Sequence, residues 1–158
     1  MSNKTIDRCR VSYQANPAML LYPQATKAQL YFNRYFNFHK MTTKEIANRL
    51  VDLCRNGKIE EAKEELFAPG IISIEPREGI LPKESKGMDA IRKKAELFVS
   101  MVDNFYGDTI SDPVVAGDYF FISWISDLQM KGEPRQINSE LCVYKTSGGK
   151  IVSEQFFY

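Results

Sequence analysis

The chain is poor in the residues from which metal and thiol sites are built. Its 158 residues include one histidine, His39, and three cysteines, Cys9, Cys54 and Cys142, which are widely spaced and form no CxxC pair. This set does not supply the usual four ligands of a zinc site, and a nucleophilic thiol would need a histidine partner. An odd number of scattered cysteines is typical of reduced thiols in a cytoplasmic protein. We therefore expect no metal site and no cofactor.

Long apolar runs are also missing. No stretch approaches the roughly 20 apolar residues that cross a bilayer, and the first residues lack the apolar core and cleavage site of a secretory signal. With 44% hydrophobic and 26% charged residues, the composition is that of an ordinary folded domain. The length suits one domain, since domains commonly run to roughly 100 to 150 residues. We expect a cytoplasmic protein with no membrane partner.

The sequence has no concentrated basic face in its main part. The formal net charge is +1, but residues 1–40 carry six basic residues against one acidic residue, whereas the remainder carries 15 basic and 19 acidic residues. Nucleic-acid binding depends on phosphate contacts from clustered basic side chains. The mildly acidic body therefore predicts no nucleic-acid partner.

Residues 1–40 differ from the rest, because they contain no glycine and their aromatic run at 31–40 follows neither a helical nor a strand period. Three interpretations stay open: a basic targeting leader, an upstream extension before a true start at Met41, or an arm whose aromatic side chains pack on the body or on a partner. The second is favoured, since Asn, Tyr, Phe, Lys and Ile all have A/T-rich codons. The chain thus divides into an extension, 1–40, and a domain, 41–158.

Two helices are predicted at the start of this domain, over 42–56 and 59–66. Thr42 and Glu45 form a capping box, and Asn56-Gly57 ends the first helix. The residues expected to face inward at helical spacing are Ile46, Leu50, Leu53 and Cys54 in the first helix and Ile59, Ala62 and Leu66 in the second.

A short strand over 71–75, ended by Pro76, and a loop over 76–86 come next. Gly87 precedes a third helix, whose expected inward face holds Ile91, Ala95, Phe98 and Val102. Four strands are then predicted over 105–115, 118–130, 134–145 and 150–158, with a glycine-containing turn between each strand and the next. Short connections make neighbouring strands antiparallel. Helices followed by an antiparallel sheet predict an α+β domain.

This order of elements resembles the nuclear transport factor 2-like superfamily. The resemblance is carried by Leu66-Phe67-Ala68-Pro69 before the first strand, the helix started by Gly87, and the ending Gly-Lys-Ile-Val-Ser-Glu-Gln-Phe-Phe. Within the superfamily, residues 41–158 look most like the SnoaL-like branch, which has ketosteroid isomerase and polyketide cyclase relatives. The resemblance implies a cone-shaped α+β barrel, in which a bent, mainly antiparallel sheet and three helices enclose an apolar pocket for a small apolar molecule. It also implies a homodimer through the outer sheet face.

The superfamily includes isomerases, cyclases, hydrolases, dehydratases and noncatalytic proteins, so individual residues must decide the function. Resemblance to the isomerase places its general base at Glu75, directly before Pro76. The isomerase tyrosine on the first helix corresponds to Leu50, and its acid on the penultimate strand corresponds to Leu141. Because leucine donates no hydrogen bond to an enolate oxygen, the familiar isomerase and cyclase mechanisms are disfavoured.

Strand alternation predicts which residues line the pocket. The expected inward sets are Phe120, Ile122, Trp124, Ser126, Leu128 and Met130 on the second strand of the meander, Ser139, Leu141 and Val143 on the third, and Val152, Glu154, Phe156 and Tyr158 on the last. Leu50, Ser73 and Phe98 complete the predicted lining.

Each candidate site residue also has an ordinary structural interpretation. Glu75 would then lie in solvent at the strand end or accept backbone hydrogen bonds in the following loop, and Glu154 would pair across strands with a lysine or arginine such as Arg135. Trp124 and Tyr158 would serve only packing.

Three functions remain open at this point. The first is an enzyme that uses Glu75, and more weakly Glu154, as a general acid or base. The second is noncatalytic binding of a small apolar molecule, and the third is a structural dimer whose pocket is filled by its own side chains.

Overall fold

A computed structural model describes residues 40–158. Cys9, His39 and the three interpretations of the N-terminal extension lie outside the described residues. In the described part, no helix is long and apolar enough to cross a membrane.

The first two helices form where the sequence predicts them. Helix α2 (Thr43–Arg55) begins at the capping box, in which Glu45 N–H donates to Thr42 Oγ1 at 3.2 Å and Thr42 N–H donates to Glu45 Oε2 at 2.7 Å. Its predicted inward face is buried. Helix α3 (Ile59–Leu66) follows, but the inward prediction for Ile59 is wrong: the residue is 39% exposed, because it lies at the first turn.

Strand β1 (Phe67–Ile74) follows α3 directly, and a register shift between Phe67 and Ile72 takes up Pro69 and Gly70. Strand β2 (Glu84–Lys86) pairs antiparallel with β1. The sequence gives no sign of β2, because its three residues carry no hydrophobic alternation.

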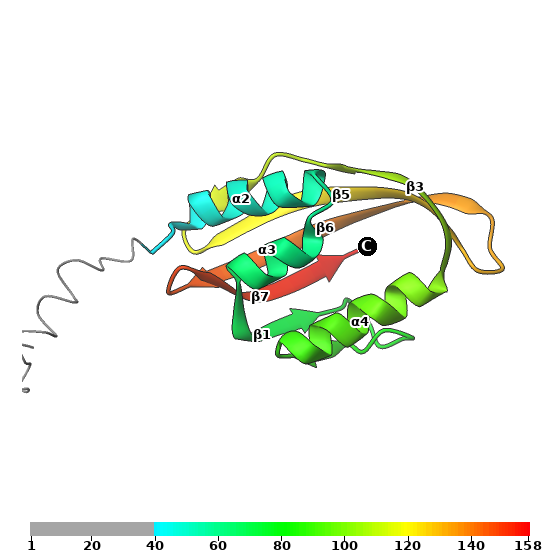
Figure 1. Ribbon diagram of the computed structural model, residues 1–158, viewed down its shortest axis with the longest axis horizontal. Helices are drawn as coiled ribbons and strands as arrows, with labels where there is room; N and C mark the ends of the chain where they lie inside the picture. The colour runs from blue at the N-terminus through cyan, green and yellow to red at the C-terminus, as the bar shows by residue number, and fades with distance from the viewer. Residues whose placement is uncertain (1–39) are drawn as a thin grey trace, which may run out of the picture. The chain divides into compact units, whose positions relative to one another are not determined.

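Helix α4 (Met88–Met101) starts after Gly87, as expected, and Ile91 is buried as predicted, but the inward prediction for Phe98 is wrong. Its buried residues are Ile91 and Lys94, whereas Phe98 is 39% exposed. In Figure 1 the later turns of α4 extend beyond the end of β1 towards β3.

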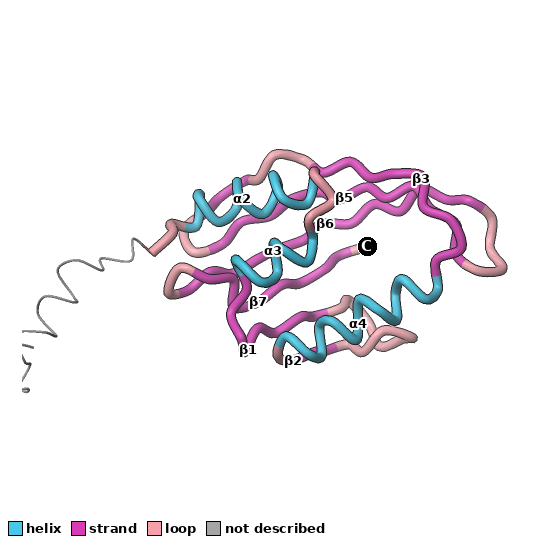
Figure 2. The backbone as a smooth tube through the Cα atoms, viewed as in Figure 1, coloured by secondary structure: helices cyan, strands magenta, loops and turns pink. Residues whose placement is uncertain are grey.

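The remaining strands are β3 (Val102–Ile110), β4 (Val114–Ala116), β5 (Tyr119–Met130), β6 (Arg135–Ser147) and β7 (Lys150–Phe157). The predicted strand over 105–115 is therefore two strands, both of which pair with β5. The sheet order is β2-β1-β7-β6-β5-β3, with β1 and β7 parallel and the other pairs antiparallel. Within residues 40–158 the sheet curls without closing, and three helices pack against it, which confirms the α+β class (Figures 1 and 2).

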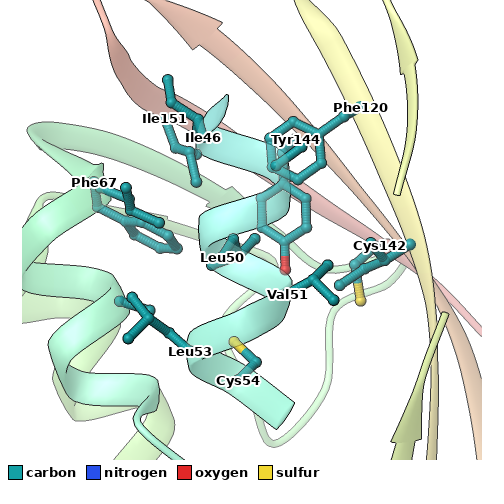
Figure 3. Packing of buried hydrophobic residues seen from close by; sticks show 14 of the residues in the cluster. Ile46, Leu50, Val51, Leu53, Cys54, Phe67, Phe120, Cys142, Tyr144 and Ile151 are labelled. Atoms are coloured by element: carbon teal, nitrogen blue, oxygen red, sulfur yellow. The ribbon is translucent and has the colours of Figure 1, made fainter. Parts of the chain in front are cut away.

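The hydrophobic core lies between α2, α3 and the sheet. Phe120 of β5 and Tyr144 of β6 are register partners, and their rings stack with centroids 4.8 Å apart. Leu50 and Val51 of α2 pack close to these rings (Figure 3). Leu50 is thus a core residue, 2% exposed, and its burial contributes about 1.5 to 3 kcal/mol.

Strand β5 faces as predicted, with Phe120, Ile122 and Leu128 buried. On β6 the alternation prediction is wrong by one residue. Cys142 and Tyr144 are buried, whereas Leu141 is 38% exposed on the opposite face, together with Ser139. Residues 141–144 are apolar or aromatic on both faces, so the sequence pattern does not indicate which face of β6 points inward.

Candidate functional site

Glu75 enters the interior at the end of β1. It continues the alternation of buried Ile71 and Ser73, and the residue is 4% exposed. Its backbone N–H donates to the Lys83 carbonyl at 2.8 Å, which extends the pairing of β1 and β2 by one step before Pro76 ends it. The interpretation of Glu75 as a solvent-exposed residue is therefore wrong.

Lys94 of α4 meets this carboxylate from the other side. It lies one helical turn after Ile91 on the buried face, and the residue is 9% exposed. Its Nζ donates to Glu75 Oε1 at 2.7 Å and to Ser73 Oγ at 2.5 Å. The same ammonium lies 4.5 Å from the centre of the Phe156 ring, a distance at which a cation is attracted to the ring face.

Tyr158, the residue after β7, hydrogen-bonds to the second carboxylate oxygen of Glu75. Its hydroxyl donates to Glu75 Oε2 at 3.1 Å, although the residue as a whole is 58% exposed. Partial burial of the hydroxyl, followed by the negative charge of Glu75, raises the pKa of Tyr158, and nearby Arg77 opposes this change. The phenol therefore stays protonated at neutral pH, and both oxygens of Glu75 have a donor.

Glu154 adds a second buried carboxyl group. It is the register neighbour of Ser73 across the parallel pair of β1 and β7. Burial raises the pKa of Glu154, while Lys94, 3.8 Å from Glu154 Oε1, and the Ser73 hydroxyl lower it. The expected pairing of Glu154 with Arg135 is wrong, because Arg135 binds Asp127 at 2.6 Å.

Glu140 is a third carboxyl group, which sequence reasoning missed. It is the register partner of Trp124, so it occupies the inward position on β6 that the sequence analysis gave to Leu141. Burial, and next the charges of neighbouring acids, raise the pKa of Glu140; Cys142 Sγ, 3.5 Å from its Oε1, is a donor that opposes this change.

The Lys94 ammonium contacts two of the three carboxyl groups, Glu75 at 2.7 Å and Glu154 at 3.8 Å. Burial, and next the repulsion of neighbouring carboxylates, raises the pKa of both Glu140 and Glu154. Within residues 40–158, no group of His, Cys, Asp or Glu side chains is placed to hold a metal ion. The chemistry that the cluster offers is proton transfer.

The other predicted pocket residues divide between the two faces of the sheet. Trp124, Ser126, Met130 and Phe156 are half-buried on the side of the cluster, and Leu128 is fully buried. Ser139 and Leu141 lie on the opposite face. A hollow of about 260 Å³ lies at the start of α4, between Pro69 and Asp89, but no residue of the carboxyl cluster lines it.

A comparison with family models matches residues 41–158 to the SnoaL-like domain. Among solved structures, a protein from Mesorhizobium loti described as a SnoaL-like polyketide cyclase and as a carbohydrate phosphatase is 31% identical. The match covers 75% of this chain and 100% of that chain, with a TM-score of 0.70. A protein from Catenulispora acidiphila with a ketosteroid isomerase-like fold, in complex with trimethylamine, is 25% identical over 74% of this chain and 87% of that chain, with a TM-score of 0.56.

A SnoaL-like protein from Jannaschia is 13% identical over 73% of this chain and 83% of that chain, with a TM-score of 0.59, and it supports the fold alone. No curated protein matches the chain. The match to the family model over 41–158, together with the similarity to the Mesorhizobium loti protein, shows that this chain belongs to the SnoaL-like family.

Proposed function

We propose that the domain catalyses general acid–base chemistry on a small apolar molecule that carries a carbonyl group, with Glu75 as the proton acceptor. The observation that carries the proposal is the position of the Glu75 carboxylate between Lys94 Nζ, 2.7 Å away, and Tyr158 OH, 3.1 Å away, beside two further carboxyl groups. Such donors fix the direction of the carboxylate, and a fixed base is more effective than a mobile one.

Glu140 occupies the inward position on β6 that the sequence analysis gave to Leu141. Burial raises its pKa, and when Glu140 is protonated its O–H can donate to an oxygen on which negative charge develops. When a proton leaves the carbon next to a carbonyl group and passes to Glu75, that charge develops on the carbonyl oxygen. An acceptor and a donor thus come from different strands of one sheet.

An apolar substrate is supported by the side chains around the cluster. Trp124, the register partner of Glu140, and Phe156, whose ring centre lies 4.5 Å from Lys94 Nζ, are half-buried beside the cluster, and Phe98 is exposed on α4. These side chains offer apolar surface to a ligand, and a desolvated site strengthens the interactions of its polar groups. The polyketide cyclase name of the Mesorhizobium loti protein is consistent with a carbonyl-bearing substrate.

A structural role is the competing function, because Lys94 ties α4 to β1 and β7 through its contacts with Ser73, Glu75 and Glu154. In this case the cluster would hold the domain together and transfer no protons. Activity towards a simple probe distinguishes the two functions.

The test uses 5-nitrobenzisoxazole, an apolar compound whose ring opens when a base removes its one acidic carbon-bound proton and the nitrogen–oxygen bond breaks. The wild-type protein should open the ring faster than its Glu75→Gln variant by about 10²-fold or more. Glu78→Gln, at an exposed position three residues later, is the matched control and should keep the wild-type rate. Equal rates for the wild type and Glu75→Gln would contradict the proposal and favour the structural role.

We further propose that the outer sheet face binds a second copy of the chain. The exposed apolar side chains of this face are Phe121, Ile125, Ile137, Leu141 and Phe157. Leu141 pairs with Phe157 and lies opposite Ser123, between Phe121 and Ile125 of β5, whereas Ile137 pairs with Asp127, so the charged pair of Asp127 and Arg135 borders the patch at its Ile137 end. A two-fold interface places the same patch on itself, so an uncharged apolar centre suits a homodimer.

A further inference from the structure

Both carboxylate oxygens of Glu75 accept hydrogen bonds, but the two oxygens differ in how close they lie to solvent. Oε1 faces Lys94, and beyond Lys94 lie Ser73 and Glu154, all of which are buried. Oε2 faces the Tyr158 hydroxyl, which belongs to a residue that is 58% exposed. A molecule that approaches from solvent therefore meets Tyr158 before it meets Glu75.

We infer that the Tyr158 hydroxyl is the group that touches the substrate, and that it passes the proton between the substrate and Glu75. This inference rests on the proposed function, because it supplies the path by which Glu75 takes part. Tyr158 is then a catalytic residue, and Glu75 is the acceptor that acts through it.

The step balances without any further reactant. The bond between the substrate and its acidic proton breaks while that proton binds the Tyr158 oxygen, and the original Tyr158 proton moves 3.1 Å along the existing hydrogen bond to Glu75 Oε2. The substrate becomes an anion, Glu75 becomes a neutral carboxylic acid, and Tyr158 ends as a neutral phenol. The reverse transfer returns a proton to the product.

The contacts around Tyr158 hold its hydroxyl for this role. Arg77, two residues after Glu75, has its guanidinium carbon 5.9 Å from the centre of the Tyr158 ring, within the range of an attractive contact between a cation and a ring. Tyr158 also directly follows β7, which pairs with β1 near Glu75 through Ile74 and Gln155. The Tyr158 ring is thus positioned by its contact with Arg77, shortly after β1, and by its own connection to β7.

A different role for Tyr158 makes the opposite prediction. If the tyrosine only covers Glu75 and must move away before the substrate binds, its hydroxyl hinders the reaction. Removal of the hydroxyl would then leave the rate unchanged or increase it. The sign of the rate change on Tyr158→Phe therefore separates a relay from a cover.

The experiment measures ring opening of 5-nitrobenzisoxazole by the full chain and by Tyr158→Phe, Glu75→Gln and the double variant. A relay predicts that Tyr158→Phe lowers kcat by about 10²-fold with little change in KM. It also predicts that the double variant is no slower than Glu75→Gln, because two residues on one path are not additive. Tyr119→Phe, at an exposed outer-face position, is the matched control and should keep the wild-type kcat.

The solvent isotope effect is the second readout, and it does not respond to a merely structural role. The Tyr158 proton exchanges with solvent whereas the carbon-bound proton of the probe does not, so a relay makes kcat lower in heavy water. Direct proton removal by Glu75 gives no such effect. A Tyr158→Phe variant with wild-type kcat, or a wild type without a solvent isotope effect, would overturn the relay while leaving Glu75 as a direct base. Loss of the difference between wild type and Glu75→Gln would instead overturn the proposed function.

Discussion

Lys94 Nζ lies 2.7 Å from Glu75 Oε1, and this contact joins the buried face of α4 to the end of β1. Removing two charges from water is costly, and their mutual attraction repays the cost only when the geometry is good and other hydrogen bonds are satisfied. Here Ser73 and Tyr158 supply those additional bonds. Replacing either Lys94 or Glu75 alone should therefore leave the charge of the other buried without its partner.

Lys94→Met should destabilise the domain by about 3 to 5 kcal/mol at neutral pH, because the variant leaves the Glu75 carboxylate buried without its ammonium. Urea denaturation followed by Trp124 fluorescence measures the change. Lys94→Met/Glu75→Gln should regain part of the loss, since the unpaired charge is gone, and Lys93→Met, at an exposed position, is the control. A loss on Lys94→Met as small as that on Lys93→Met would show that the pair contributes nothing to stability.

Local sequence signals predict much of this fold. The capping box of Thr42 and Glu45 starts α2, and the glycine turns at 117, 132 and 148–149 separate the antiparallel strands, since each turn uses a positive φ that glycine adopts easily. The alternation of Phe120, Ile122 and Leu128 correctly orients β5. These features depend on residues within one element or one turn.

The features that the sequence could not predict depend on contacts between elements. On β6, apolar residues occur on both faces, and only the pairing with β5, which sets Cys142 opposite Ile122 and Tyr144 opposite Phe120, shows which of them face inward. Lys94 has the spacing of a core residue, one turn after Ile91, but a lysine is rarely buried without a partner. Its carboxylate partners come from β1 and β7, which lie far apart in the sequence, so only the folded chain brings them together.

Glu140→Gln should make stability less dependent on pH. In the folded protein the pKa of Glu140 is raised from the ordinary value of 4.5, chiefly by burial. The folded state therefore retains a proton that the unfolded chain loses, and the free energy of unfolding falls as the pH rises from about 4.5 through the folded pKa. In Glu140→Gln this part of the fall should disappear.

Urea denaturation at a series of pH values between about 4 and 8 tests this prediction. Glu133→Gln, at an exposed position in the turn between β5 and β6, should keep the pH dependence of the wild type. A Glu140→Gln curve that runs parallel to the wild-type curve throughout this range would show that Glu140 has an ordinary pKa in the folded protein.

Leu141→Glu tests the outer face and the orientation of β6 together. Leu141 is exposed beside Phe157 in the proposed homodimer interface, whereas the next residue, Cys142, is fully buried. A buried charge without a partner costs several kcal/mol, so Cys142→Glu should unfold the domain, while Leu141→Glu should stay folded and lose only its partner.

Light scattering should then report a dimeric mass for the wild type and half that mass for Leu141→Glu, with similar melting temperatures when each protein is compared by circular dichroism. Lys86→Glu, on exposed β2, should remain dimeric; a monomeric wild type would contradict the interface, and an unfolded Leu141→Glu would contradict the outward orientation.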